Sequence, residues 1–156
     1  MPRNKAGKYA ELAEEIDSVL AGENDGVARM ATVAAMLAGA FDHYSWTGFY
    51  RLLGPGAGGL VIGPYQGTLG CLRIAFGQGV CGSAAEQRRT LVVDDVDAFP
   101  GHIACDSRSR SEIVVPVFDP AGVLIAVLDV DSMEAAAFDG DDARGLEEIV
   151  RRVFAG

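Results

Sequence analysis

The sequence predicts an α+β domain, because helix-type patterns at both ends of the chain enclose a hairpin-rich middle. Apolar residues recur at helical spacing before residue 41 and again after residue 139. Between them the pattern changes to alternation and to short apolar runs separated by glycine- and proline-rich turns. No internal repeat or domain boundary is visible, so we expect residues 1–156 to form a single domain.

The composition supports one ordinary hydrophobic core. At 156 residues, of which 49% are apolar, the chain can bury roughly two thirds of its unfolded surface without metal or disulfide staples. The net charge of −9 argues against nucleic acid and against an anionic membrane as partners, because both select a basic face.

Neither a secretory signal nor a membrane span is apparent, so a cytoplasmic location is expected. The longest apolar run, residues 27–41, contains Arg29 and is shorter than the about 20 residues that a span needs. In a reducing compartment, an odd count of three cysteines indicates inert core residues or reactive thiols rather than a disulfide framework.

Two helices are expected before the sheet. The first ends near Gly22, and the second follows Asp25. Their inward faces are helically spaced apolar residues: Tyr9, Leu12, Ile16, Val19 and Leu20, then Met30, Val33, Leu37 and Phe41.

The sheet is expected to begin at Ser45, where alternation places Trp46 and Tyr50 on one face of a strand. A glycine-rich turn over residues 54–59 returns the chain along residues 60–62 as a hairpin. Residues 63–70 are rich in turn-forming residues and are expected to lie outside the sheet.

The middle of the chain alternates short strands with loops. Residues 71–76 and 90–93 are predicted strands, and a helix from the glycine-rich segment 77–82 to about Arg88 lies between them. Residues 94–111 form a long loop, a length that usually indicates function or disorder.

Two apolar strands, residues 113–118 and 123–130, follow and are joined by a turn at residues 119–122. Asp139 is the expected N-cap of a final helix. The inward face of that helix is apolar: Leu146, Ile149, Val150 and Val153.

The main catalytic candidate lies in residues 99–116, FPGHIACDSRSRSEIVVP. A turn delivers Cys105 into a run of small polar residues, and Glu112 follows immediately before a strand. A thiol and a carboxylate at a loop–strand junction can do redox or nucleophilic chemistry. We therefore interpret Cys105 as a catalytic thiol, with Cys71 and Cys81 upstream in glycine-rich surroundings.

Asp129 and Asp131 share one face at the end of an apolar strand. Two interpretations stay open: they cap the strand at solvent, or they bind a cation or ammonium and raise each other's pKa so that one donates a proton. Glu112, in the entry loop of a neighbouring strand, would be a third carboxylate in the same pocket.

Three further features allow both a structural and a functional interpretation. Cys81 in FGQGVCG, residues 76–82, lies at a helix N-terminus that favours an anion, but it is equally well explained as a small core residue. Trp46 and Tyr50 are either core aromatics or the walls of a pocket. The histidines and cysteines lack the CxxC and HxxxH spacings of zinc sites, so no metal is expected.

Seven features in this order resemble the free methionine-(R)-sulfoxide reductases, which are small single GAF-domain enzymes. The three cysteines, with gaps of 10 and 24 residues, are more specific than any general GAF pattern. The match runs from residue 46 to the final helix and departs from the family mainly at Tyr65, where Phe is expected. The features are WTGFY (46–50), GPYQG (63–67), Cys71, GVCG (79–82), FPGHIACDS (99–107), SEIVVP (111–116) and LDVDS (128–132).

The resemblance implies a GAF-like fold, an antiparallel sheet of about six strands flanked by helices, in a homodimer. It places the pocket on the sheet face opposite the terminal helices. It also implies that Cys105 is the attacking thiol, Cys71 the partner that forms a disulfide with it, and Cys81 an accessory thiol.

The implied substrate is free L-methionine (R)-S-oxide. Trp46 and Tyr50 would wall its sulfoxide and methyl end, and Glu112, Asp129 and Asp131 would hold its polar groups. The implied reaction leaves a cysteine sulfenic acid, then a disulfide that thioredoxin or a similar dithiol reduces, with no metal or organic cofactor.

Two functions from other classes remain as alternatives. A non-catalytic GAF sensor of a small metabolite would leave all three thiols without a role. A thiol redox switch would keep the cysteines but would need neither Trp46 nor the pair Asp129 and Asp131.

Overall fold

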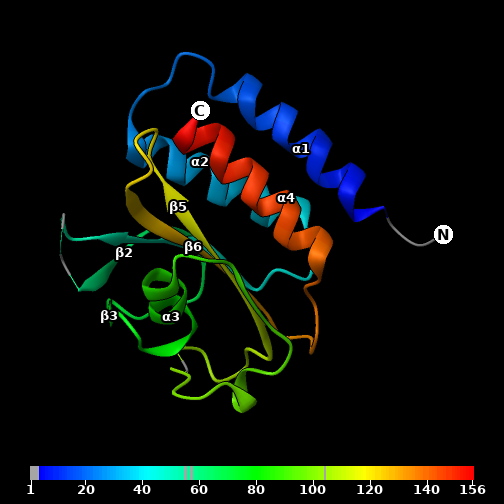
Figure 1. Cartoon of the computed structure of the whole chain (residues 1–156). Helices are drawn as coiled ribbons and strands as arrows, with labels where there is room; N and C mark the ends of the chain where they lie inside the picture. Colours follow the sequence, from blue (N-terminus) through cyan, green and yellow to red (C-terminus); the bar gives the residue numbers. More distant parts are fainter. Residues whose placement is uncertain (1–3, 55, 57, 104) are drawn as a thin grey trace.

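In the computed structural model, residues 4–54, 56, 58–103 and 105–156 are described, and they form one six-stranded antiparallel sheet with helices on both faces (Figure 1). The strand order is β3-β2-β1-β6-β5-β4. The strands are β1 (Trp46–Leu52), β2 (Gly59–Gly67), β3 (Arg73–Ala75), β4 (Leu91–Val93), β5 (Ser111–Phe118) and β6 (Leu124–Ser132). The helices are α1 (Lys5–Val19), α2 (Gly26–Ala40), α3 (Gly79–Gln87) and α4 (Gly140–Val150), with a 3₁₀ turn at Val96–Ala98 and a π-helical end at Arg151–Ala155.

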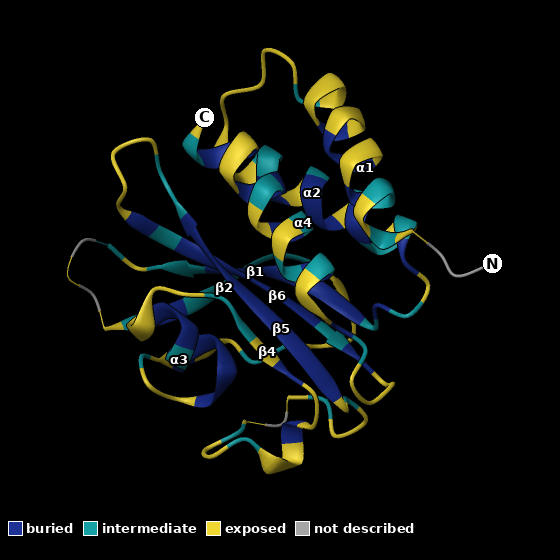
Figure 2. Ribbon diagram, turned by 45° about the vertical axis from the view of Figure 1, so that its right-hand side comes forward, coloured by how far each residue is buried: buried dark blue, intermediate teal, exposed yellow. Residues whose placement is uncertain are grey.

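The terminal helices α1, α2 and α4 cover one face of the sheet, and the short helix α3 lies on the other (Figures 1 and 2). On the first face, buried residues of the three helices pack against Phe49, Ile113 and Leu128. This large apolar core supplies most of the hydrophobic stabilisation. The face under α3 is therefore free to carry polar side chains.

The helices begin where the sequence supplies N-caps. Asn4 accepts a hydrogen bond from the backbone N–H of Gly7, and Asp25 accepts one from that of Ala28. Asp139 makes a full capping box with Asp142 at the start of α4. The predicted cap at Asp139 is thus confirmed.

Asp142 also joins the two ends of the chain, although no part of it is exposed. Its carboxylate accepts hydrogen bonds from Lys5 Nζ at 2.7 Å and from the Tyr9 hydroxyl at 2.6 Å. The Tyr9 hydroxyl also contacts that of Tyr44. A buried carboxylate with this many donors is satisfied, so the network fixes α1 against α4.

The register of the central strands determines what faces α3. Trp46 on β1 pairs with Asp131 on β6, and Asp131 pairs on its other side with Glu112 on β5. In the next row of the same face, Asp129 lies opposite Gly48. Side chains of one cross-strand row lie about 5 Å apart, so the register collects these residues under α3.

The α+β class and the order of helices and strands are confirmed, but the bounds of several strands differ from the prediction, and β6, expected over residues 123–130, spans Leu124–Ser132. β2 continues to Gly67, although residues 63–70 were expected to leave the sheet. The reason is the close pairing of Gly48 with Tyr65, where any side chain at Gly48 would collide with the Tyr65 Cβ. β5 begins at Ser111, and β3 spans only Arg73–Ala75.

Two smaller points complete the fold. In the predicted hairpin turn over residues 54–59, residues 55 and 57 lie outside the described part of the chain. Among the described residues, no helix is both long and apolar enough to span a bilayer.

Replacing Asp139 by Ala should lower the free energy of unfolding by about 1 kcal/mol, because the backbone N–H groups of Asp141 and Asp142 lose their acceptor. Urea unfolding of the variant measures this difference. The exposed Asp42 caps no helix, and Asp42→Ala should change stability by less than about 0.5 kcal/mol. Equal unfolding midpoints for Asp139→Ala and the unmodified protein would contradict the capping role.

Candidate active site

A pocket lies on the sheet face under α3, opposite the terminal helices. Residues from β1, β5, β6, α3 and the loop before β5 line it. Of the eight residues that the sequence singled out, seven line this pocket: Trp46, Tyr50, Cys81, Cys105, Glu112, Asp129 and Asp131. The eighth, Cys71, reaches the pocket through a covalent bond to Cys105.

A disulfide joins Cys71 and Cys105 at the rim of the pocket, with their Cα atoms 5.4 Å apart. Cys105 is exposed and Cys71 is half-buried, so a reductant can approach the sulfur of Cys105 from solvent. The bond connects the segment after β2 to the long loop before β5. Residues of both segments line the pocket, among them Gly70 next to Cys71 and Asp106 next to Cys105.

Hydrogen bonds support the same connection between the two cysteine-bearing segments. The Trp46 indole N–H donates to the Thr68 carbonyl at 2.9 Å, and the Thr68 hydroxyl donates to the Asp106 carboxylate at 3.0 Å. Arg108 pairs with the same carboxylate, and its hydrogen bonds hold the pKa of Asp106 well below the usual range. Asp106 is therefore a constant anion that anchors the loop beside Cys105.

Aromatic rings form another part of the pocket wall. The ring of Trp46 stacks on Tyr50 at 5.7 Å and on Tyr65 at 4.9 Å between centroids. Trp46 and Tyr50 are almost fully buried in the core under α3, and both also line the pocket. The sequence left open whether they are core aromatics or pocket walls, and they are both. Gly70 leaves room beside them, since a Cβ there would lie 3.2 Å from the Tyr50 hydroxyl.

Three carboxylates meet at the floor of the pocket. Glu112 is the second residue of β5, rather than part of its entry loop as predicted, and it lies beside Asp131 across the β5–β6 pair. Glu112 is 6% exposed and Asp129 is 5% exposed. Asp129 is therefore too deeply buried to be only a cap of the strand at solvent, which was one of the two interpretations left open by the sequence. The pair belongs to a shared acidic cluster.

Burial raises the pKa of all three acids above their ordinary values. For Glu112 and Asp131 the neighbouring charge of Asp129 adds to burial, and both pKa values lie well above the usual range. For Asp129 hydrogen bonding from its neighbours opposes burial, so its pKa rises less. The cluster can therefore hold protons and an ionised carboxylate in the same place.

Asp129 has an oxygen without a partner. Among the described residues, no hydrogen-bond donor reaches its Oδ1 atom, which is inaccessible to solvent. A buried carboxylate oxygen without a partner destabilises the folded protein unless a cation or a hydrogen-bond donor binds to it. The floor of the pocket is thus built to receive a positive group.

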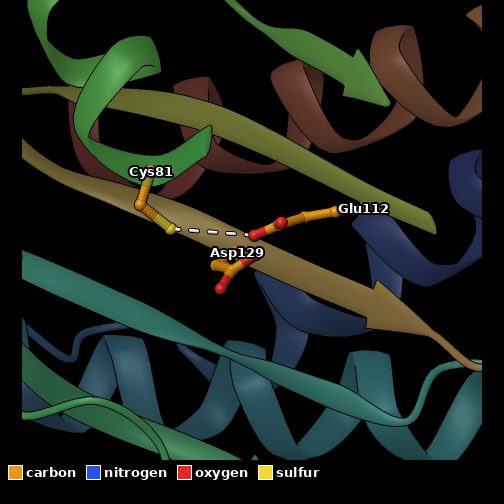
Figure 3. A group of neighbouring side chains, drawn as sticks. All are labelled: Cys81, Glu112 and Asp129. Carbon is orange, nitrogen blue, oxygen red and sulfur yellow. Dashed lines mark hydrogen bonds between the residues drawn. The ribbon is translucent and has the colours of Figure 1, made fainter. Parts of the chain in front are cut away.

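Cys81 lies in the first turn of α3, beside these acids. Its Sγ atom is 3.9 Å from Glu112 Oε2 (Figure 3), and burial together with the charge of Asp129 raises the pKa of the thiol well above its ordinary value. The sequence allowed Cys81 to be a core residue or a site residue. It is buried in the core under α3 and also lines the pocket.

The glycine-rich start of α3 is explained by close backbone packing. A Cβ on Gly82 would collide with the carbonyl oxygen of Ala75, and Gly79 has a φ of +60°. The first turn of the helix lines the pocket at Gly79, Val80 and Cys81. Its backbone N–H groups favour an anion such as a carboxylate.

Sequence reasoning missed the contacts of His102, which lines the pocket, and of Tyr65. His102 Nε2 lies 3.8 Å from Glu112 Oε1, so protonated imidazole would face the acid cluster. Tyr65 stacks on Trp46. His102 is in the same loop as Cys105, and its position within FPGHIACDS was the available signal.

Glu112→Gln should stabilise the protein at neutral pH. Below about pH 4 the carboxyl group is protonated in both the folded and the unfolded state. As the pH rises, the unfolded chain loses this proton while the folded protein retains it, because the folded pKa is raised, and the free energy of unfolding falls. Glutamine cannot ionise, so the variant avoids this loss.

Urea unfolding at pH 7 and near pH 4 tests this prediction. The variant should have the higher midpoint at pH 7, and the difference should disappear near pH 4. Glu15 is exposed on α1, and Glu15→Gln should show no such pH-dependent gain. A Glu112→Gln variant that is less stable than the original at pH 7 would mean that the ionised carboxylate is stabilised in the pocket.

Comparison with known proteins places this geometry in a family. A family model described as "GAF domain" matches residues 26–153. GAF domain-containing protein A of Dictyostelium discoideum is 45% identical over 148 residues, covering 95% of this chain and 91% of that protein. Free methionine-R-sulfoxide reductase of Escherichia coli is 39% identical over 150 residues, covering 96% and 88%.

A solved structure agrees with these matches. The free methionine-R-sulfoxide reductase of Neisseria meningitidis, determined in complex with its substrate, superimposes with a TM-score of 0.91 at 48% identity. The superposition covers 98% of this chain and 90% of that one. The chain therefore belongs to the GAF domain family, in the group that includes the free methionine-R-sulfoxide reductases.

Proposed function

We propose that this protein reduces free L-methionine (R)-S-oxide to L-methionine by thiol chemistry. The observation that carries the proposal is the disulfide between Cys71 and Cys105 at the rim of a pocket whose floor holds Glu112, Asp129 and Asp131. A redox-active thiol pair beside groups that hold protons is what sulfoxide reduction requires. The similarity to named reductases over most of the chain supports the same conclusion.

The substrate is a free amino acid because the pocket can meet both of its charges. The acid cluster, with the unpartnered oxygen of Asp129, suits an ammonium group. The N-terminus of α3 suits a carboxylate. Trp46 offers an aromatic face to the methyl and sulfur end. A methionine within a peptide has neither charge.

In the first step the Cys105 thiolate attacks the sulfoxide sulfur while a protonated carboxyl group of the cluster donates a proton to the oxygen. The raised pKa of Glu112 and of Asp131 keeps such a proton available near neutral pH. The hydroxyl group passes to the Cys105 sulfur, so that methionine leaves and Cys105 becomes a sulfenic acid.

In the second step the Cys71 thiol condenses with the sulfenic acid, and water is released as the disulfide forms. The described structure corresponds to this oxidised state. A dithiol protein such as thioredoxin then reduces the exposed bond and restores both thiols. We place this cycle in the cytoplasm, in a protein that is a single GAF domain over residues 1–156 and a homodimer.

The two alternatives explain less of the geometry. A metabolite sensor leaves the paired cysteines at the pocket rim without a role. A simple thiol switch leaves unexplained why Trp46 and three carboxylates line the same pocket as Cys105 of the disulfide. Incubation with racemic free methionine sulfoxide and dithiothreitol, followed by separation of the epimers, decides between them. Loss of only the R epimer is expected, and loss of neither would refute the proposal.

Substitution of the two disulfide cysteines should impair the reaction at different steps. Cys105→Ser should abolish reduction even with excess dithiothreitol, because no sulfenic acid can form at the reacting position. Cys71→Ser should still yield about one methionine per chain in a single turnover but be recycled poorly by thioredoxin. Substantial steady-state activity of Cys105→Ser would assign the attack to another thiol.

Selectivity for the free amine tests the pocket independently of the cysteines. N-acetylation removes the charge that the carboxylates face and adds bulk at their position. We expect kcat/KM for N-acetyl-methionine sulfoxide to be lower by about 100-fold or more, equivalent to about 2.7 kcal/mol. Asp129→Asn or Asp131→Asn should lower the rate for the free amino acid and narrow this preference.

The exposed Asp42 provides the matched control, since Asp42→Asn should leave the preference unchanged. Comparable kcat/KM values for the free and acetylated substrates would show that the acid cluster does not bind the ammonium group.

A further inference from the structure

Cys81 has no step in the proposed reaction, yet it lies in the most polar part of the pocket. Its Sγ atom, one carboxylate oxygen of Glu112 and one of Asp129 all lie within 4.8 Å of one another (Figure 3). All three side chains are buried. They come from three different elements, α3, β5 and β6, so their meeting is a property of the fold.

Among the described residues, Asp129 has no positive partner. The Oδ1 atom of Asp129 is buried and receives no hydrogen bond from the described residues. Protonated His102 would face Glu112, at 3.8 Å, rather than this oxygen. A substrate ammonium group can pair with the carboxylates, but it gains nothing from a thiol. A metal ion can use all three groups.

The spacing suits a tetrahedral ion with a mixed sulfur and oxygen ligand set. With Zn–S of about 2.3 Å and Zn–O of about 2.0 Å, tetrahedral angles place sulfur and oxygen about 3.5 Å apart. The observed distance from Cys81 Sγ to Glu112 Oε2 is 3.9 Å, so this pair needs a shift of only a few tenths of an ångström, and the distances to the Asp129 oxygen are within 4.8 Å. Hard ions such as Mg²⁺ and Ca²⁺ gain little from the sulfur.

We propose that Cys81, Glu112 and Asp129 form a site for a borderline-soft divalent cation, Zn²⁺ being the representative ion, with water as the fourth ligand. Binding replaces the S–H bond of Cys81 by a metal–sulfur bond and releases the thiol proton to solvent, with no electron transfer. The cation neutralises carboxylates that otherwise repel one another in a buried space. If the proposed function is correct, the cation occupies the position of the substrate ammonium group and excludes the substrate.

The test uses the oxidised full-length protein, in which the disulfide leaves Cys81 as the free thiol. Addition of Co²⁺ should produce a sulfur-to-cobalt charge-transfer absorption that saturates at one ion per chain, and Zn²⁺ should displace it. Because Cys71 and Cys105 are bonded to each other, this absorption can come from Cys81 alone. Equilibrium dialysis then gives the affinity for Zn²⁺.

Cys81→Ser and Cys81→Ala should abolish the absorption and weaken Zn²⁺ binding by at least about tenfold. Asp129→Asn should weaken binding while leaving the sulfur absorption detectable at high Co²⁺. Asp141 is the matched control, since its half-exposed carboxylate on α4 pairs with Arg144 away from the pocket, and Asp141→Asn should bind as the unmodified protein does. Circular dichroism checks that each variant is folded.

Absence of both the charge-transfer absorption and bound Zn²⁺ in the unmodified protein would overturn the proposal. Equal Zn²⁺ affinity of the folded Cys81→Ser variant and of the unmodified protein would also overturn it. Because the experiment contains no sulfoxide and no reductant, its outcome is independent of reductase activity. A protein that binds Zn²⁺ but reduces nothing would retain this site and lose the proposed function.

Discussion

The rest of the site depends on three carboxylates that lie close together on one face of the central strands, with Glu112 and Asp129 buried and Asp131 half-buried. Glu112 and Asp131 are direct cross-strand partners, and Asp129 lies in the next row. Like charges at this distance and depth cannot all ionise, so the pocket retains protons and attracts cations. Placing these carboxylates together costs free energy of folding. The apolar core that α1, α2 and α4 bury on the other face of the sheet offsets this cost.

Loops, rather than strands, place the disulfide of Cys71 and Cys105 beside this cluster. The Trp46 indole, Thr68 and Asp106 form a chain of hydrogen bonds from the aromatic wall to the loop that carries Cys105. Trp46, a strand residue, is therefore connected both to the aromatic wall of the pocket and to the segment next to Cys105.

Much of this could be predicted from the sequence because the signals are local. Alternation in residues 128–132 places Asp129 and Asp131 on one face, and Asp139 is followed by a helix with a clear apolar face. The extension of β2 could not be predicted, because it depends on the close approach of Gly48 and Tyr65 between two strands. Local composition at residues 63–70 favoured a turn.

The contacts of single side chains were the least predictable part. That His102 faces Glu112 follows from how the loop folds back on β5, which no periodicity encodes. Asp142 joins α1 to α4 across nearly the whole chain. Cys81 could be placed at a helix start from its glycine neighbours, but its distance from Glu112 depends on how α3 packs over the sheet.

We propose that Cys105 reacts with a substrate held by the acid cluster and is then captured by Cys71. The most direct test of this proposal is peptide mapping of fully reduced protein after one equivalent of free methionine (R)-S-oxide is added without reductant. We expect a disulfide between Cys71 and Cys105 that forms in step with methionine release, while Cys81 remains a free thiol. Methionine release with Cys81 in the disulfide, or thiol oxidation without methionine release, would contradict the proposal.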